Sequence, residues 1–320
     1  MKSKEIWLIG TGEMGIEYAK VLLELNIEFT PIGRSETSCN NFLEKTGLQP
    51  YVGGLKFYLE SNPVLPNAVI VAVGIESLSS TTEVLLQYGV KKILLEKPGV
   101  GSPEEIQGLY DASKINSAKI LLAYNRRFYS SIIKLKELID VDGGVKSFNF
   151  EFTEWSHIVK ALKKHPVEHN YWFLGNSSHV IDTAFYVCGA PTEFSAYFTG
   201  GTEWHPSSSI FTGAGKCKND ILFSYCANWE GPGRWSLEFV TKTRRLILRP
   251  MESLQEQLIG SVAINPVLID NSLDIQFKPG LYLQTRDFIE GKYDEFCDIS
   301  EQYYMINNVY KKMSGYKCSI

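Results

Sequence analysis

A glycine-rich turn near the start of the chain is the first place where residue types and spacing could do chemistry. Gly10, Gly12 and Gly15 form the pattern Gly-x-Gly-x-x-Gly between an apolar run over 6–9 and a helical pattern over 14–25. In this context the first glycine allows a tight turn, the second lets the backbone approach a pyrophosphate, and the third lets helix and strand pack closely. The amides at the helix N-terminus can bind the phosphates. The pattern predicts a dinucleotide site, the alternative being an ordinary turn, and the expected contacts are Gly10, Thr11, Gly12, Glu13, Met14 and Gly15, with the Glu13 side chain in solvent.

The end of the second predicted strand bears on which dinucleotide binds. An enzyme that uses NAD usually carries an acidic residue there, about 20 residues beyond the glycines, to bond the ribose hydroxyl. Here Gly33 stands near that position, followed by Arg34 and Ser35. Arg34 can pair with a 2′-phosphate, and Ser35 can donate a hydrogen bond to it. We therefore expect NADP to be favoured over NAD, the alternative being an exposed arginine in a loop.

A lysine follows a later predicted strand. Glu96-Lys97-Pro98 comes directly after the predicted strand 92–95, and ligands of open parallel sheets bind beyond the carboxyl ends of the strands. Lys97 can reach a cofactor ribose and a substrate hydroxyl from there, and its charge would stabilise a developing alkoxide. A surface lysine that closes a strand is the structural alternative. Glu96 and Val73, which ends the buried run 69–73, are also expected to contact the cofactor.

Two patterns divide the 320 residues into two predicted domains. Over 1–124, apolar strands alternate with helical patterns, as in a doubly wound α/β (Rossmann) domain. Over 125–320, alternating strands follow one another, with helical patterns at about 177–188, 282–290 and 300–313. We expect an α+β domain there, with a large and mostly antiparallel sheet that supplies the substrate contacts.

Four motifs stand in a specific order along the chain. They are the glycine turn over 10–15, Glu96-Lys97-Pro98, Tyr124-Asn-Arg-Arg-Phe128 and His179-Val-Ile-Asp182, and beyond about Gly189 only the general layout is informative. With these motifs the chain resembles the Gfo/Idh/MocA oxidoreductases, named for glucose–fructose oxidoreductase and inositol dehydrogenase. The resemblance implies a Rossmann domain followed by an open-faced sheet, through which members form homodimers or homotetramers. It also implies that Lys97 contacts the nicotinamide ribose and the substrate, and that the Lys97–Pro98 bond is often cis.

The resemblance makes His179 the candidate acid/base residue. An imidazole titrates near neutral pH, so it can take a hydroxyl proton during oxidation and return it during reduction. Asp182, one helical turn on, either orients His179 or pairs within the helix. Many family members carry an acid four residues before the histidine, where this chain has Gly175. Asn176 is expected to bind a substrate hydroxyl through its amide or to cap the helix.

Further substrate contacts are expected around these residues. Tyr124 and Arg126 lie where the family lines the site near the nicotinamide. His169 and Trp172 stand just before His179, and aromatic faces with polar groups suit carbohydrate recognition. Core packing is the alternative use of Trp172.

Composition limits the classes of function. With 44% hydrophobic residues, 21% charged residues and a formal net charge of -4, the chain has an ordinary globular composition and no general affinity for nucleic acid or acidic membranes. No apolar run approaches the roughly 18 residues of a membrane helix. The six cysteines show no CxxC pair or metal-ligand spacing, so they predict reduced thiols in the cytoplasm and no metal site.

Together these expectations describe an NAD(P)-dependent oxidoreductase that moves a hydride between nicotinamide and a carbon of a sugar, cyclitol or sugar derivative. Two alternatives stay open. A non-catalytic, NADP(H)-responsive binding protein would keep the fold without turnover. An enzyme that recycles the cofactor internally during epimerisation or elimination would show no net change in nicotinamide absorbance.

Overall fold

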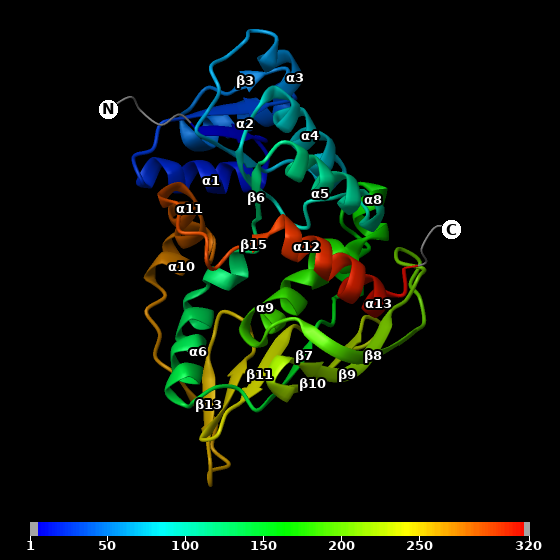
Figure 1. Ribbon diagram of the computed structural model, residues 1–320. Helices are drawn as coiled ribbons and strands as arrows, with labels where there is room; N and C mark the ends of the chain where they lie inside the picture. Colours follow the sequence, from blue (N-terminus) through cyan, green and yellow to red (C-terminus); the bar gives the residue numbers. More distant parts are fainter. Residues whose placement is uncertain (1–5, 317–320) are drawn as a thin grey trace. The chain divides into compact units, whose positions relative to one another are not determined.

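The computed structural model describes residues 6–316, which form two compact units (Figure 1). One unit contains the chain up to Asn125 together with Leu273–Tyr303, and the other contains Arg126–Ser272 and the chain from Tyr304 onward. The first break thus falls within one residue of the boundary expected after Tyr124. We expected one continuous second domain over 125–320. In the structure, residues 273–303 pack within the first unit instead.

Two contacts explain where 273–303 packs. Helix α11 (Leu281–Glu290) lies against α1 (Glu13–Glu24), and the short strand β15 (Cys297–Asp298) pairs antiparallel with β6 (Lys119–Leu122). Leu281 and Phe288 of α11 are fully buried. The apolar face of α11 therefore forms part of the core of the first unit.

The first unit is built on a seven-stranded sheet in the order β15-β6-β5-β4-β1-β2-β3, parallel except for β15. Its other strands are β1 (Ile6–Ile9), β2 (Phe29–Gly33), β3 (Tyr51–Val52), β4 (Ala68–Val71) and β5 (Lys92–Leu95). Its further helices are α2 (Glu36–Thr46), α3 (Gly54–Leu59), α4 (Leu78–Tyr88), α5 (Ile106–Ile115), α10 (Ser272–Gln276) and α12 (Ile299–Met305), with 3-10 turns η1 (Ile75–Ser77) and η2 (Pro103–Glu105). Every residue of β1 and β4 is buried, as expected for strands covered on both faces.

The second unit is built on an eight-stranded sheet in the order β14-β13-β12-β11-β7-β10-β9-β8, in which β7 and β10 are the parallel pair. Its strands are β7 (Ser147–Glu151), β8 (Pro191–Thr199), β9 (Ile210–Cys217), β10 (Leu222–Asn228), β11 (Ser236–Val240), β12 (Arg244–Leu248), β13 (Gln255–Leu258) and β14 (Asn265–Pro266). Its helical segments are η3 (Asn125–Phe128), α6 (Ser130–Val141), α7 (Ser156–Val159), α8 (Pro166–Asn170), the π-helical η4 (Phe173–Ser177), α9 (Ser178–Cys188), η5 (Lys218–Asp220), η6 (Ile306–Tyr310) and α13 (Lys311–Ser314). The two sheets confirm the predicted fold class.

Aromatic side chains join the second sheet to α9. Phe148 on β7 stacks between Phe223 of β10 and Phe239 of β11, its direct partners in the ladders, with ring centroids 5.4 and 5.7 Å away. Phe185 of α9 meets this row edge-on, 6.1 Å from Phe148. These contacts hold α9, which carries His179, on the sheet. No helix within residues 6–316 has the length and apolar character needed to cross a membrane.

Candidate functional site

The glycine turn lies between β1 and α1, as the sequence predicted. Gly10 has a φ of +112°, and a Cβ there would lie 2.2 Å from the carbonyl oxygen of Ala72. A Cβ at Gly15 would lie 2.0 Å from the carbonyl oxygen of Gly10, so both positions exclude a side chain. Gly12 differs, because it is the N-cap of α1 and a Cβ there would meet no described atom within 4 Å. The N-terminus of α1 therefore faces open space in which its amides can receive an anion, which fits a dinucleotide phosphate.

Gly12 borders a cavity of about 500 Å³ in the first unit, a size typical of small-molecule sites. Residues at the carboxyl ends of β1, β2 and β4 line it, where ligands of parallel sheets bind. Of the predicted cofactor residues, those that line it are Gly10, Thr11, Gly12, Arg34, Ser35 and Val73. The others, which do not line it, are Glu13, Met14, Gly15, Gly33, Glu96 and Lys97. Glu13 is exposed, as expected, and its charge suits the start of a helix.

The end of β2 forms one wall of this cavity. Arg34 is exposed, and Ser35 is the N-cap of α2, where its hydroxyl accepts a hydrogen bond from the Ser38 amide at 3.3 Å. Gly33 is needed for packing, because a Cβ there would lie 2.3 Å from the sulfur of Cys39. Lys56 on α3, which no sequence motif marks, also lines the cavity. The residues before Lys56 lie close to Arg34, since a Cβ at Gly54 would lie 3.8 Å from the Arg34 Cα.

Lys97 lies in a turn that is fixed from several sides within the first unit. The hydroxyl of Tyr18 on α1 donates to the Glu96 carboxylate at 2.8 Å, and burial is the largest cause of a raised pKa for Glu96. The Lys97–Pro98 bond is cis, as the resemblance implied. The Pro98 carbonyl accepts from the Gln302 side chain at 2.9 Å, and the same amide donates to the hydroxyl of buried Tyr124 at 3.1 Å. Gln302 of α12 has no motif around it that could have singled it out.

His179 lies in the first turn of α9 and is 5% exposed. Its ring centroid lies 6.2 Å from that of Trp235, which precedes β11. Asn176 does not cap α9, so the helix-capping role expected for it was wrong. Asn176 instead lies inside the π-helical segment η4, which runs directly into α9.

The side chain of Asn176 is directed to a carboxylate that the sequence analysis missed. Its Nδ2 atom lies 3.1 Å from both carboxylate oxygens of Glu154, which follows β7 and is 1% exposed. Ser177 Oγ donates to Glu154 at 2.8 Å, and the Trp235 indole NH donates at 3.3 Å. Burial raises the pKa of Glu154 to about 7, although the hydrogen bonds from Ser177 and Asn176 and the nearby Arg234 act in the opposite direction. The only sequence signal was an acid placed shortly after an alternating strand.

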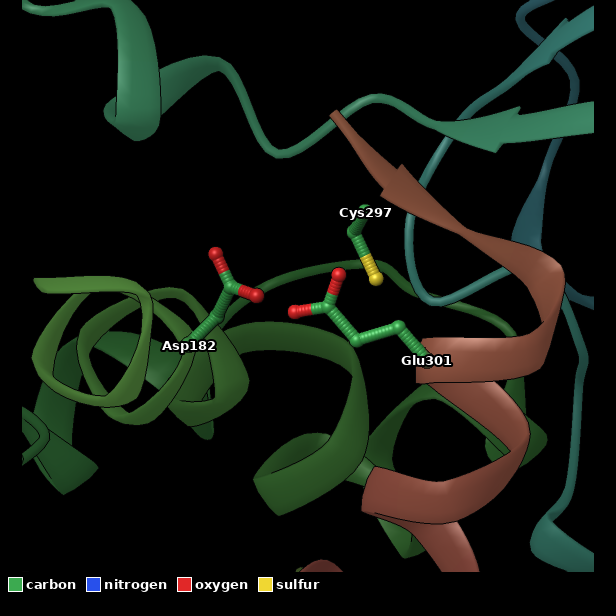
Figure 2. Close-up of side chains that lie close together, drawn as sticks. All are labelled: Asp182, Cys297 and Glu301. Carbon is green, nitrogen blue, oxygen red and sulfur yellow. The ribbon is translucent and has the colours of Figure 1, made fainter. Parts of the chain in front are cut away.

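Asp182 pairs with a residue outside its helix. It projects from α9 (Figure 2), and both of its oxygens accept from the guanidinium of Arg127, at 2.9 and 2.6 Å. Arg127 is 4% exposed and its guanidinium carbon lies 4.7 Å from the ring centroid of Tyr186. A buried bidentate pair of this kind fixes η3 to α9.

The other predicted substrate residues take part in aromatic packing. The Arg126 guanidinium lies over the Trp235 ring, 4.7 Å from its centroid. His169 and Trp172 both pack near Trp204, with centroid distances of 6.0 and 5.9 Å. Trp172 is 7% exposed, in agreement with the packing alternative weighed for it. Of these residues, Arg126 packs against Trp235, the same ring that lies near His179.

No protein-family model matches the chain, and no curated protein matches its sequence. Solved structures do match over nearly the full length. Levoglucosan dehydrogenase in complex with NADH and levoglucosan is 15% identical with a TM-score of 0.78, and the match covers 98% of this chain and 97% of that one. UDP-N-acetylglucosamine 3-dehydrogenase from Acidithiobacillus ferrooxidans is 14% identical with a TM-score of 0.74, covering 98% and 97%. An oxidoreductase from Agrobacterium radiobacter in complex with NAD+, L-tartaric acid and magnesium is 12% identical with a TM-score of 0.75, covering 97% and 96%.

At such identities the likeness concerns the fold. The order of a parallel dinucleotide-type sheet and a mostly antiparallel second sheet agrees with the layout that the four sequence motifs implied. The chain therefore has the fold of the Gfo/Idh/MocA-type oxidoreductases.

Proposed function

We propose that the chain is an NAD(P)-dependent oxidoreductase that acts on a hydroxyl-bearing carbon of a sugar, cyclitol or sugar derivative. The observation that carries the proposal is the cavity at the carboxyl edge of the parallel sheet, bordered by Gly10 and Gly12 at the start of α1. Gly12 leaves open space at the N-terminus of α1, where a pyrophosphate must approach. Matching structures that hold NADH with levoglucosan, or NAD+ with L-tartaric acid, support a nicotinamide cofactor and a polyhydroxylated substrate.

NADP is the cofactor that we favour. Arg34 and Lys56 both line the cavity near the end of β2, and both side chains are exposed. Two cations suit a 2′-phosphate, whereas an NAD site usually presents a carboxylate to the ribose at this strand end. Glu76, the carboxylate among the lining residues, comes from η1 and not from β2.

In the proposed reaction, Lys97 and His179 have different roles. A nicotinamide cofactor held by the cavity that Gly10, Gly12 and Arg34 line would supply the acceptor for the hydride of the substrate C–H bond. Lys97 orients the substrate hydroxyl and stabilises the alkoxide that develops as the hydride leaves. His179 takes the hydroxyl proton, so that an alcohol and NAD(P)+ give a carbonyl compound, NAD(P)H and one proton. The reverse reaction uses the same groups with His179 as the acid.

Two measurements test this proposal in sequence. Fluorescence titration with NADPH and NADH asks whether the cavity binds a nicotinamide cofactor, and turnover with a panel of polyols and keto-sugars then asks for hydride transfer. Lys97→Ala and His179→Ala should each lower kcat at least about 100-fold, and His179→Ala should leave NADPH affinity within about threefold. Wild-type turnover in both variants would refute the assigned roles. NADPH binding without any redox change, checked by product analysis, would favour one of the two alternatives.

We further propose that the protein acts in the cytoplasm as a homodimer or homotetramer. The second sheet exposes large apolar side chains, including Tyr197 (66%) and Leu222 (60%), as an interface between copies would require. Light scattering on the purified protein measures the mass directly, and a monomer at micromolar concentration would contradict the proposal.

A further inference from the structure

Glu154 is a buried acid for which the proposed reaction has no role. It follows β7 by three residues, and only 1% of its surface is exposed. A carboxylate is buried at a large cost unless hydrogen-bond donors surround it. Here the donors come from two segments, namely Asn176 and Ser177 in η4 and Trp235 before β11.

The hydrogen bonds to Glu154 determine how the Asn176 amide is oriented. An ionised carboxylate only accepts hydrogen bonds, so the NH2 group of Asn176 must face it, at 3.1 Å from each oxygen. The Oδ1 atom then lies on the other side of the amide carbon. None of the hydrogen bonds found among residues 6–316 engages this oxygen, and the Asn176 side chain is partly exposed. The arrangement leaves an acceptor available for a ligand.

This acceptor lies in the same helical run as the proposed acid/base residue. Asn176 precedes His179 by three positions in the continuous run of η4 and α9. Trp235 touches both neighbourhoods, since its indole NH donates to Glu154 and its ring lies 6.2 Å from that of His179. The carboxylate, the amide and the imidazole therefore belong to one local assembly.

We propose that Glu154 is a positioning residue, which holds the Asn176 amide so that Oδ1 accepts a hydrogen bond from a substrate hydroxyl beside His179. The inference rests on the proposed function for the substrate, but the coupling between Glu154 and Asn176 does not. When Glu154 is protonated it can donate to Oδ1, and the amide can turn over and offer its NH2 group instead. Glu154 thus determines whether the site presents an acceptor or a donor.

Burial of Glu154 makes this exchange accessible near neutral pH, against the effect of the nearby positive charge. Its charged and titratable neighbours are Arg234, whose guanidinium lies 3.7 Å away, Arg126 on η3, and His179 across the Trp235 ring. Burial is the largest influence on Glu154 and raises its pKa to about 7. Protonation of Glu154 is therefore expected near neutral pH.

Nuclear magnetic resonance of the full chain tests the coupling without a substrate. The side-chain amide signals of Asn176, assigned by their loss in Asn176→Ala, should shift with pH around a midpoint near 7. Glu154→Gln should abolish this titration, whereas Glu151→Gln, the same charge change on β7, should leave it in place. If Glu154→Gln does not fold, Glu154→Asp should give a smaller shift, because its carboxylate is one methylene shorter.

Two results would overturn the inference. Signals that do not respond to pH would show that Glu154 does not control the amide, and a titration that survives Glu154→Gln but vanishes in His179→Gln would assign the effect to His179. Where a substrate is found, Glu154→Gln should raise KM about tenfold above pH 8 with kcat changed less, the effect of one misplaced hydrogen bond. An unchanged KM would refute the substrate contact alone. Absence of any turnover would refute the proposed function while the resonance result stands.

Discussion

Arg127 and Asp182 form a buried bidentate ion pair, with side chains 3% and 1% exposed and N–O distances of 2.9 and 2.6 Å. Removing one partner leaves the other charge buried without this counter-ion. Asp182→Ala or Arg127→Ala should therefore lower the free energy of unfolding by about 3–5 kcal/mol. Chemical denaturation measures the loss. Arg245→Ala, which breaks the more exposed pair with Glu238, is the control and should cost no more than about 1 kcal/mol.

The raised pKa of Glu154 predicts a pH dependence of stability. The folded protein binds this proton more tightly than the unfolded chain, because the pKa rises from 4.5 to about 7. The stabilising contribution is complete below pH 4.5 and is lost as the pH rises through 7, amounting to roughly 3 kcal/mol. Glu154→Gln removes this dependence, so its stability relative to wild type should improve steadily from pH 5 to pH 8. Denaturation at pH 5.5, 7 and 8.5 measures the difference, and parallel curves for the two proteins would contradict it.

The glycine turn offers two substitutions with opposite consequences. Gly15→Ala places a Cβ 2.0 Å from the Gly10 carbonyl oxygen, and the forced shift should destabilise the protein by about 1–3 kcal/mol. Gly12→Ala meets no described atom within 4 Å, so its thermal midpoint should stay close to wild type. Its methyl group would instead occupy space beside the helix N-terminus, and NADPH affinity should fall at least about tenfold. Calorimetry and fluorescence titration separate the two effects, and equal losses of stability would disprove the distinction.

Cofactor preference should depend on the two cations in the cavity wall. Arg34→Ala and Lys56→Ala should each weaken NADPH binding about 10- to 100-fold, the usual range for a charge-assisted contact. NADH binding should change much less, because NADH has no 2′-phosphate. Lys45→Ala, at an exposed lysine of α2 that does not line the cavity, serves as the matched control. Equal losses for NADPH and NADH would exclude a role in discrimination.

Local patterns were sufficient to predict the elements that surround the glycine turn. The limits of β1 and β5 agree with the predicted strands over 6–9 and 92–95, because strands buried on both faces need near-continuous apolar sequence. Strand β9 was not predicted, since Gly213 and Gly215 interrupt its pattern. A Cβ at Gly213 would lie 2.4 Å from the ring of Tyr225 on the neighbouring strand. That glycine reflects a tertiary contact, which a single segment of sequence does not reveal.

In the candidate site, too, residues marked by a local pattern could be predicted, whereas residues whose roles depend on distant partners could not. Gly10, Arg34 and the Lys97 turn could be found because each follows a strand. Glu154 and Gln302 could not, because their roles come from Asn176 and Pro98, which are 22 and 204 positions away. Asn176 was expected as a helix cap, but the π-helical turn carries the helix past it.

The return of 273–303 to the first unit has a consequence for how the protein is made. During synthesis the ribosome releases strands β1 to β6 early. Helix α11 and strand β15, which contact α1 and the edge of β6, follow more than 150 residues after the unit's first segment ends at Asn125. A nascent or truncated chain that ends before Leu273 exposes the surface that Leu281 and Phe288 would bury. The unit that carries the glycine turn is therefore completed only after residues 273–303 have left the exit tunnel, once the intervening segment 126–272 has been synthesised.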